Sequence, residues 1–379
     1  MNRMCVLVWS CLSRAPITLT LSVMKTVPNR TPERTYHKMS VPKVIIDTDA
    51  GIDDAHAIFM ALEAHKQRVI EVIAITTVQG NTLVHNVNTN VLRILRTVEL
   101  MEIPVYSGTT KPLVHPWVDP EGNYHGLDGF GDAELPPMPS SSSLLKPQHA
   151  VWALIELVKR YPGEIVLTAL GPLTNVALAI RIDPSFTSRL LDIYVMGGNT
   201  EGKGNATLSA EFNFACDPEA ARVVLEETTL PIHLTPFEIC KDGVIIPYSV
   251  RHEMGSIQSP AADLMNKIEA KHLAGKHNEN WLSFDQLAMA WLIDDAKKQQ
   301  SHYHGEKNST ACDKRSEGAL IKTTQSCFAT VELQGSLTRG QVVIDHKGAL
   351  NQKSNVIIMT SVDVQRYLRY LRMALGAEF

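Results

Sequence analysis

The sequence predicts an α/β protein with a doubly wound, mostly parallel central sheet and helices on both of its faces. Short apolar runs alternate with segments of helical periodicity, at the interval expected for successive strand–helix units. The apolar runs are typical of strands that are buried on both faces of a parallel sheet. Polar residues cluster directly after these runs, at the sheet edge where open α/β folds bind their ligands.

The expected strands and helices can be assigned in order along the chain. Strands are expected at residues 44–46, 72–78, 103–106, 164–170, 192–196, 231–235, 326–333, 341–345 and 356–360, with a hairpin formed by 326–333 and 341–345. Helices are expected from about residue 53 and at 84–98, 148–161, 171–181, 218–227 and 362–375, and region 245–295 is expected to be helical. Residues 297–319 are polar and aperiodic, so an inserted loop is expected there.

Residues 1–40 differ in character from the rest of the chain. A short apolar stretch at 5–12 resembles a weak secretion signal, and 28–34 is polar and contains proline, as in disordered segments. We expect a disordered or targeting N-terminal extension over 1–40, followed by a single domain over 41–379. A cytoplasmic protein is expected, with secretion as the alternative.

Composition argues against several classes of function. A net charge of −4 with only 6% aromatic residues disfavours nucleic-acid binding, which uses a basic face. No segment after residue 40 reaches the ~18 apolar residues that a membrane span requires. The six cysteines show no Cys-x-x-Cys spacing, so they predict neither a zinc site nor a disulfide framework.

Four carboxylates, Asp47, Asp49, Asp53 and Asp54, follow the first expected strand within eight residues, and Gly51 lets the chain turn sharply between strand and helix. Like charges so close repel one another, and a helix N-terminus offsets only about 0.3–1 kcal/mol for each acid near it. A divalent cation offsets the repulsion far better, and carboxylates mixed with a backbone carbonyl favour Ca²⁺. The alternative is one N-capping aspartate among solvated acids, but capping needs only one of the four.

Five blocks of sequence resemble the calcium-dependent nucleoside hydrolases of the inosine–uridine-preferring group. They are 47–54, 76–81, 169–175, 196–217 and the pair 284–285, and the resemblance covers about 43–375. It implies hydrolysis of the N-glycosidic bond of ribonucleosides to ribose and free base, with a small-molecule ribonucleoside as the partner. It also implies a homo-oligomer, a dimer or a tetramer. No Gly-rich phosphate loop is present, which argues against nucleotide substrates.

The resemblance implies a role for each residue around the metal. Asp49, Asp54 and Asp285 correspond to the carboxylate ligands of Ca²⁺, and Leu170 to a backbone carbonyl ligand. Asp49 is also expected to hold the attacking water and to take its proton. This chemistry suits the reaction, because an oxocarbenium-like transition state is stabilised by nearby carboxylates and a metal ion acidifies the bound water.

The remaining residues of the motifs are expected to bind the substrate. Asp53 and Asn213 correspond to groups that bind the ribose 2′- and 3′-hydroxyls, and Asn205 and Glu211 to those that bind the 5′-hydroxyl. Asn81 is expected near the reacting face of the sugar. Capping of the expected helix at 218–227, which follows Asp217, is the alternative role for Glu211 and Asn213.

The base side departs from the family pattern. His125 lies in a glycine-rich stretch (123–131) of a long loop, which is expected to close over the base. Phe284 stands where many members have a histidine that protonates the leaving base, and phenylalanine cannot donate a proton. Phe284 either stacks on the base or packs in the core; His125 or a solvent channel then protonates the base, or turnover is poor. Ala50 replaces the usual proline and is expected only to loosen the turn.

Two other functions remain open at this point. A catalytically weak nucleoside-binding protein would keep the metal site without releasing base. A haloacid-dehalogenase-like phosphatase would use Asp47 as nucleophile and Asp49 as acid, although that family does not require Asp53 and Asp54.

Overall fold

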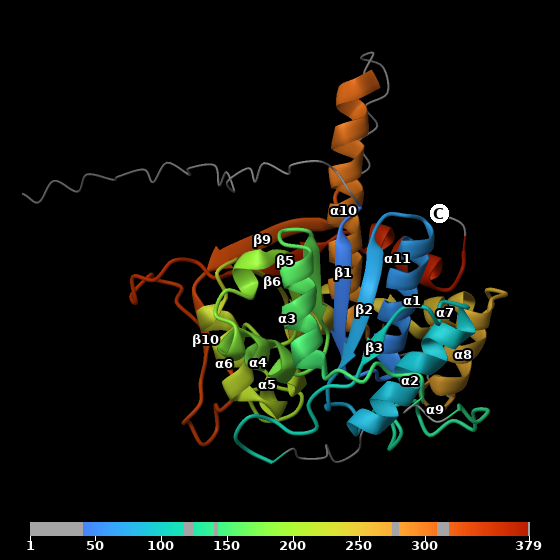
Figure 1. Cartoon of the computed structure of the whole chain (residues 1–379), viewed down its shortest axis with the longest axis horizontal. Coiled ribbons are helices and arrows are strands. Elements are labelled where there is room, and N and C mark those ends of the chain that lie inside the picture. The colour runs from blue at the N-terminus through green and yellow to red at the C-terminus, as the bar shows by residue number, and fades with distance from the viewer. Residues whose placement is uncertain (1–40, 117–123, 140–142, 275–279, 309–317, 378–379) are drawn as a thin grey trace, which may run out of the picture. The chain divides into compact units, whose positions relative to one another are not determined.

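The computed structural model describes residues 41–116, 124–139, 143–274, 280–308 and 318–377, and Figure 1 shows their arrangement. Residues 40–379 form one compact unit. The expected N-terminal extension, residues 1–40, lies outside the described residues. Every described helix is too short or too polar to cross a membrane.

The centre of the fold is an eight-stranded sheet that is parallel except for one edge strand. Its strands lie in the order β3 (Val105–Tyr106), β2 (Glu71–Thr77), β1 (Lys43–Thr48), β4 (Ile165–Ala169), β5 (Leu190–Met196), β6 (Ile232–Thr235), β12 (Val356–Val362) and β9 (Ile321–Cys327). β9 runs antiparallel to β12. The predicted fold class is confirmed.

The order of the strands locates the edge at which ligands bind. From β1 the chain builds outward through β2 and β3, and then returns to the other side of β1 for β4, β5 and β6. β1 and β4 are hydrogen-bonded neighbours, so the loops after them leave the sheet at the point where the winding reverses. Doubly wound sheets bind their ligands in the crevice at this point.

Two apolar cores cover the two faces of the sheet. Successive side chains of a strand point to opposite faces, so Val44 and Ile46 lie in one core and Ile45 in the other. The first core includes helices α1 (Ile52–Lys66), α2 (Val84–Thr97), α8 (Pro260–Ile268), α10 (Asp285–Asn308) and α11 (Val364–Ala374). The second includes α3 (Ala150–Arg160), α4 (Thr174–Ile182) and α6 (Pro218–Glu227).

A small helical region precedes α10. It consists of α7 (Tyr248–Met254), α8 and α9 (Ala270–Leu273), together with the two-residue antiparallel strands β7 (Ile246–Pro247) and β8 (Asn280–Trp281). The helical expectation for 245–295 is confirmed for α7, α8, α9 and the start of α10; β7 and β8 were not predicted, and residues 275–279 lie outside the described residues. Strands of two residues are too short to show an alternating pattern in the sequence.

The C-terminal part differs from the prediction at two places. α10 continues to Asn308, so the loop expected from residue 297 is wrong as far as 308, and residues 309–317 lie outside the described residues. Lysine and glutamine favour helix without an apolar face, and this end of α10 extends beyond the sheet in Figure 1. β9 begins at Ile321, before the predicted start at residue 326. The sequence did not predict this part of the strand, because its residues are exposed and polar and form no apolar run. The expected hairpin forms between β10 (Ala329–Val331) and β11 (Val342–Ile344).

Candidate active site

The acidic stretch after β1 enters α1 through a tight turn. A β-carbon on Gly51 would lie 2.4 Å from His125 Nδ1 and 2.6 Å from Asn81 Nδ2. Gly51 has φ −84°, an angle that any residue can adopt. Glycine is therefore required at this position by the close packing and not by the backbone conformation. Ala50 has φ 23°, which the proline ring, fixed near −65°, cannot adopt. Alanine at this position therefore does more than loosen the turn.

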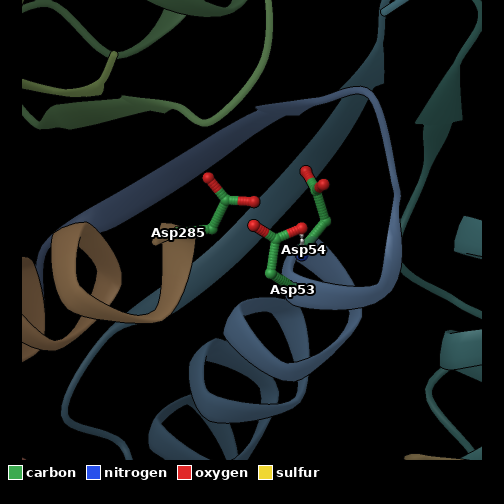
Figure 2. Close-up of side chains that lie close together, drawn as sticks. All are labelled: Asp53, Asp54 and Asp285. Carbon is green, nitrogen blue, oxygen red and sulfur yellow. Dashed lines mark hydrogen bonds between the residues drawn. The ribbon is translucent and has the colours of Figure 1, made fainter. Parts of the chain in front are cut away.

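Three carboxylates from two helix N-termini converge at this edge of the sheet. Asp53 and Asp54 lie in the first turn of α1, and Asp285 begins α10. One oxygen of each lies within 4.8 Å of the others, and Figure 2 shows the three carboxylates turned toward one another. The positive ends of both helix dipoles favour negative charge here.

Burial and mutual repulsion make this cluster costly without a cation. Burial raises the pKa of Asp53 and of Asp54 to about 6. Burial, with the charges of Asp53 and Asp54 next, raises the pKa of Asp285 well above its usual range. Asp285 Oδ1 is buried and has no hydrogen-bond partner in the described part of the chain. A bound cation would reverse these shifts, because it favours the charged form of every carboxylate near it.

Asp49 lies next to the cluster and is fixed by the backbone. Its Oδ2 accepts the Asn81 N–H at 2.8 Å, whereas its Oδ1 is buried without a partner among the described residues. A β-carbon would come within 2.1 Å of Asp49 Oδ2 at Gly80, and within 2.8 Å of Oδ1 at Gly171. The sequence did not predict that these two glycines approach Asp49, although both lie inside the motif blocks 76–81 and 169–175, just after a strand.

Asp54 is held by donors on three sides. Thr48 Oγ1 donates to its Oδ1 at 2.5 Å, and Gly51 N–H and Asn81 Nδ2 donate to its Oδ2 at 2.9 and 3.1 Å. Thr48 is a further residue that sequence reasoning missed. Its position within the acidic motif was the available signal, because a hydroxyl there can orient a neighbouring carboxylate.

Leu170 follows β4 and presents its carbonyl to the same region. That carbonyl accepts Asn213 Nδ2 at 2.8 Å, and Asn213 Nδ2 also lies 3.2 Å from the Met196 carbonyl. A carbonyl oxygen has two lone pairs, so one remains for another ligand. Asn213 thus ties the loops after β4 and β5 together beside the acidic cluster.

Glu211 caps the short helix α5 (Phe212–Cys216), whereas α6 is capped by Asp217. Its carboxylate also accepts the Gly198 N–H at 2.7 Å, and burial raises its pKa to about 7. Asn205 is exposed, and its Oδ1 accepts the Phe212 N–H at 2.9 Å. The capping role expected for Glu211 and Asn213 at α6 is therefore wrong; Glu211 caps α5 instead, and this role does not exclude substrate binding.

His125 borders the carboxylate cluster, and Phe284 directly precedes Asp285. His125 Nδ1 accepts the Ile52 N–H at 3.0 Å and lies 3.8 Å from Asp53 Oδ1. Because Nδ1 accepts, the neutral ring carries its hydrogen on Nε2, and burial lowers the pKa of His125 to about 4. Phe284 is half-buried, with its ring nearly parallel to that of Phe237 at a centroid separation of 5.9 Å.

Comparison with known proteins gives consistent matches. The sequence profile described as inosine-uridine preferring nucleoside hydrolase matches residues 44–369. An inosine-uridine preferring nucleoside hydrolase of Leishmania major is 30% identical over 328 residues, 86% of this chain and 94% of that protein. The structure of an inosine-guanosine nucleoside hydrolase has a TM-score of 0.74 and 30% identity, and the match covers 89% of this chain and 99% of that one. A plant nucleoside hydrolase structure has a TM-score of 0.74 and 26% identity, over 89% of this chain and 100% of that one.

The profile match includes the acidic stretch after β1, Leu170, Asn213 and Asp285. It covers most of the chain, and the solved structures share the fold over nearly their full length. The chain therefore belongs to the inosine-uridine preferring nucleoside hydrolase family and is an N-ribosyl hydrolase.

Proposed function

We propose that this chain hydrolyses ribonucleosides to ribose and free base with Ca²⁺ at the carboxylate cluster and Asp49 as the general base. The convergence of Asp53, Asp54 and Asp285 within 4.8 Å is the observation that carries this proposal. Asp285 comes from a distant part of the chain, so no local structural role explains why it meets the other two.

The residues present fit a calcium ion. Asp54 and Asp285 of the cluster would hold it together with Asp49 and the Leu170 carbonyl, whereas Asp53 is left for the substrate. All of these donors are oxygen, as hard cations prefer. Two of their oxygens, Asp49 Oδ1 and Asp285 Oδ1, are buried without hydrogen-bond partners among the described residues. When bound, Ca²⁺ supplies a water of lowered pKa and an anchor for the ribose diol.

Asp49 Oδ1 accepts the proton of the attacking water in this scheme. The Asn81 N–H fixes the other oxygen of the same carboxylate, so Oδ1 keeps its direction during the reaction. Asp53 and Asn213 bind the 2′- and 3′-hydroxyls, and Asn205 and Glu211 bind the 5′-hydroxyl. The carboxylates below the sugar stabilise the positive charge that develops at the anomeric carbon.

The departing base meets His125 and Phe284. His125 is neutral at pH 7, so its Nε2–H serves as a hydrogen-bond donor to the base. Phe284 contributes a ring face for stacking and no proton. Cleavage is slower when the leaving purine or pyrimidine only accepts a hydrogen bond than when a general acid transfers a proton to it.

The test is chromatography of the free base released from inosine, uridine, adenosine, guanosine and cytidine, with and without a chelator. We expect release that stops on chelation and returns with Ca²⁺. Full activity in the chelator, with a metal analysis that shows no bound ion, would refute the calcium part of the proposal.

A nucleoside-binding protein without useful turnover is the second candidate. Phe284 in place of an acid, with a neutral His125, favours it specifically. Thermal stabilisation by nucleosides without release of base would identify this case. The phosphatase alternative loses support, because the chain belongs to the nucleoside hydrolase family and Asp47 Oδ1 already accepts hydrogen bonds from Thr76 Oγ1 and Asn175 Nδ2.

We also propose that the protein is cytoplasmic and forms a homodimer or homotetramer. Family resemblance supports the oligomer, and the unpatterned cysteines support the compartment. Light scattering coupled to gel filtration tests the first, and fractionation of cells that express the full chain tests the second.

A further inference from the structure

The loop that carries His125 is docked on the junction between α8 and α9. Gly131 N–H donates to the His125 carbonyl at 2.7 Å, which closes the loop on itself. A β-carbon on Gly131 would lie 2.2 Å from the Ile268 carbonyl, so the loop and the end of α8 are in close contact. Lys271 adds an ion pair with Asp132 at 3.3 Å, but this pair is exposed.

Two rings make the closest contact between the loop and α9. The Tyr124 ring stacks on the His272 imidazole, with centroids 3.9 Å apart and planes at 16°. His272 Nε2 also donates to the Tyr124 carbonyl at 2.5 Å. Tyr124 in turn presents its ring in an edge contact with His125, with centroids 5.2 Å apart. His272, Tyr124 and His125 thus form a continuous series of contacts that ends beside Asp53.

A buried ion pair supports the junction of α8 and α9 next to His272. Glu269, between α8 and α9, is fully buried and accepts Arg251 Nε at 2.7 Å and Trp281 Nε1 at 2.8 Å. Arg251 is fully buried as well. A buried pair with hydrogen bonds on both partners fixes the backbone around it, since any displacement leaves an uncompensated charge.

Contacts on two sides therefore hold the His125 side chain in position. The Ile52 N–H holds its Nδ1 on the α1 side, and Tyr124 contacts its ring on the α9 side. If the loop moved outward, the imidazole would leave the carboxylate cluster, and Nε2 would lose its direction relative to a bound nucleoside. A misplacement of about 1 Å is enough to reduce a rate by about a hundredfold.

We propose that His272, acting through the stacked Tyr124 ring, is a positioning residue that holds His125 over the carboxylate cluster. The role of His125 itself rests on the proposed function. His272 touches neither the cluster nor the reacting atoms. Its role is to fix the position of the loop that contains Tyr124 and His125.

The experiment compares three single variants of the full chain. His272→Ala removes both the ring and the donor, His272→Phe keeps a ring for the stack, and Lys271→Ala is the matched control on the same face of contact between α9 and the loop. Two measurements are made on each: amide hydrogen exchange of the peptide containing residues 124–132, and kcat and KM for base release.

His272→Ala is expected to speed exchange of that peptide and to lower kcat about tenfold with a smaller change in KM. His272→Phe should recover part of both effects, and Lys271→Ala should stay within about twofold of the parent, as an exposed ion pair contributes little. In a His125→Ala background, His272→Ala should add almost nothing, because it acts through His125.

Unchanged exchange in His272→Ala would overturn the proposal, and so would losses that multiply in the double variant. A parent protein that releases no base from any nucleoside would refute the proposed function, but not the positioning role of His272. In that case, hydrogen exchange alone decides. Faster exchange in His272→Ala but not in Lys271→Ala supports the positioning role, and equal exchange in both variants refutes it.

Discussion

The residues proposed to bind the sugar and those proposed to meet the base, here the sugar side and the base side of the candidate site, are built in opposite ways. On the sugar side, most of the carboxylates come from one contiguous stretch after β1. Neighbouring donors hold these carboxylates in place, and Asp54 by itself accepts three hydrogen bonds. On the base side, His125, Phe284 and His272 come from three separate segments and are only half-buried. Each of the three makes a ring contact with a neighbouring aromatic side chain.

This difference separates what must stay constant from what can vary. In the proposed mechanism, cleavage of any ribonucleoside requires the same sugar and water geometry, which the buried carboxylates would provide. The proposed recognition of the base rests on stacking and on one hydrogen-bond donor, and these can change without disturbing the residues that would hold the metal. Variants on the sugar side should therefore affect all nucleosides equally, whereas variants on the base side should change the ranking among them.

Asp49→Ala should have the largest effect. It removes the oxygen that accepts the proton of the water and one proposed ligand, so release of base should fall at least a thousandfold for every nucleoside. Asp242→Ala, at an exposed aspartate outside the site, is the control and should retain activity. Chromatographic assay of each variant measures this, and more than a few per cent residual turnover in Asp49→Ala would contradict the role of Asp49.

Removal of the cation should abolish activity and make stability depend on pH. Burial raises the pKa of Asp53 and of Asp54 from 3.8 to about 6, so between these values the folded protein binds more protons than the unfolded chain. Chelated protein should therefore become less stable as the pH rises from about 4 to about 7, and Ca²⁺ should cancel the loss. Thermal unfolding midpoints at several pH values, with chelator and with Ca²⁺, test the sign. A chelated protein that gains stability over this range would contradict it.

Gly80→Ala should lower activity about a hundredfold by displacing Asp49, because the new β-carbon would lie 2.1 Å from Asp49 Oδ2. Gly318→Ala is the control, since no heavy atom lies within 4 Å of its β-carbon and φ is unremarkable there. Equal kcat/KM for the two variants, with both proteins folded by circular dichroism, would show that Asp49 tolerates the displacement.

Gly80 also illustrates how much the sequence could predict. Apolar runs and helical periodicity were sufficient for β1, α1 and the winding of the sheet, because burial on both faces leaves a strong local signal. The contact between Gly80 and Asp49 left none, since a glycine in a loop does not reveal which side chain it approaches. The extension of α10 to Asn308 was missed for a different reason: the sequence after residue 296 is polar and shows no apolar periodicity.

The acids after β1 predicted a cation site from the sequence alone, through their mutual repulsion. The approach of Asp285 to Asp54 was predicted only through the family resemblance, because contacts between distant segments are not encoded in spacing. The stack of Tyr124 on His272 had no counterpart in any motif, and only the three-dimensional arrangement shows it.

Phe284→His tests the base side directly. A histidine at this position would supply a proton to the leaving base, so we expect the ratio of kcat/KM values between purine and pyrimidine nucleosides to shift about tenfold. Phe284→Leu, which removes the ring without adding an acid, is the matched control. An unchanged ranking of nucleosides in Phe284→His would mean that this side chain packs against Phe237 and does not touch the base.

Asn205→Ala should have the smallest effect and lies at the boundary between the two sides. The side chain is exposed and its Oδ1 already accepts the Phe212 N–H, so one hydroxyl contact at its amide is the most that a substrate gains from it. Loss of a single exposed hydrogen bond is worth about 0.5–1.5 kcal/mol, which corresponds to a rise in KM of roughly two- to tenfold. The rise should be the same for every base, and it should disappear with 5′-deoxynucleosides, which lack the hydroxyl. A variant that discriminated among bases but not between these two sugars would assign Asn205 to the base side, and the division of the site would have to be redrawn there.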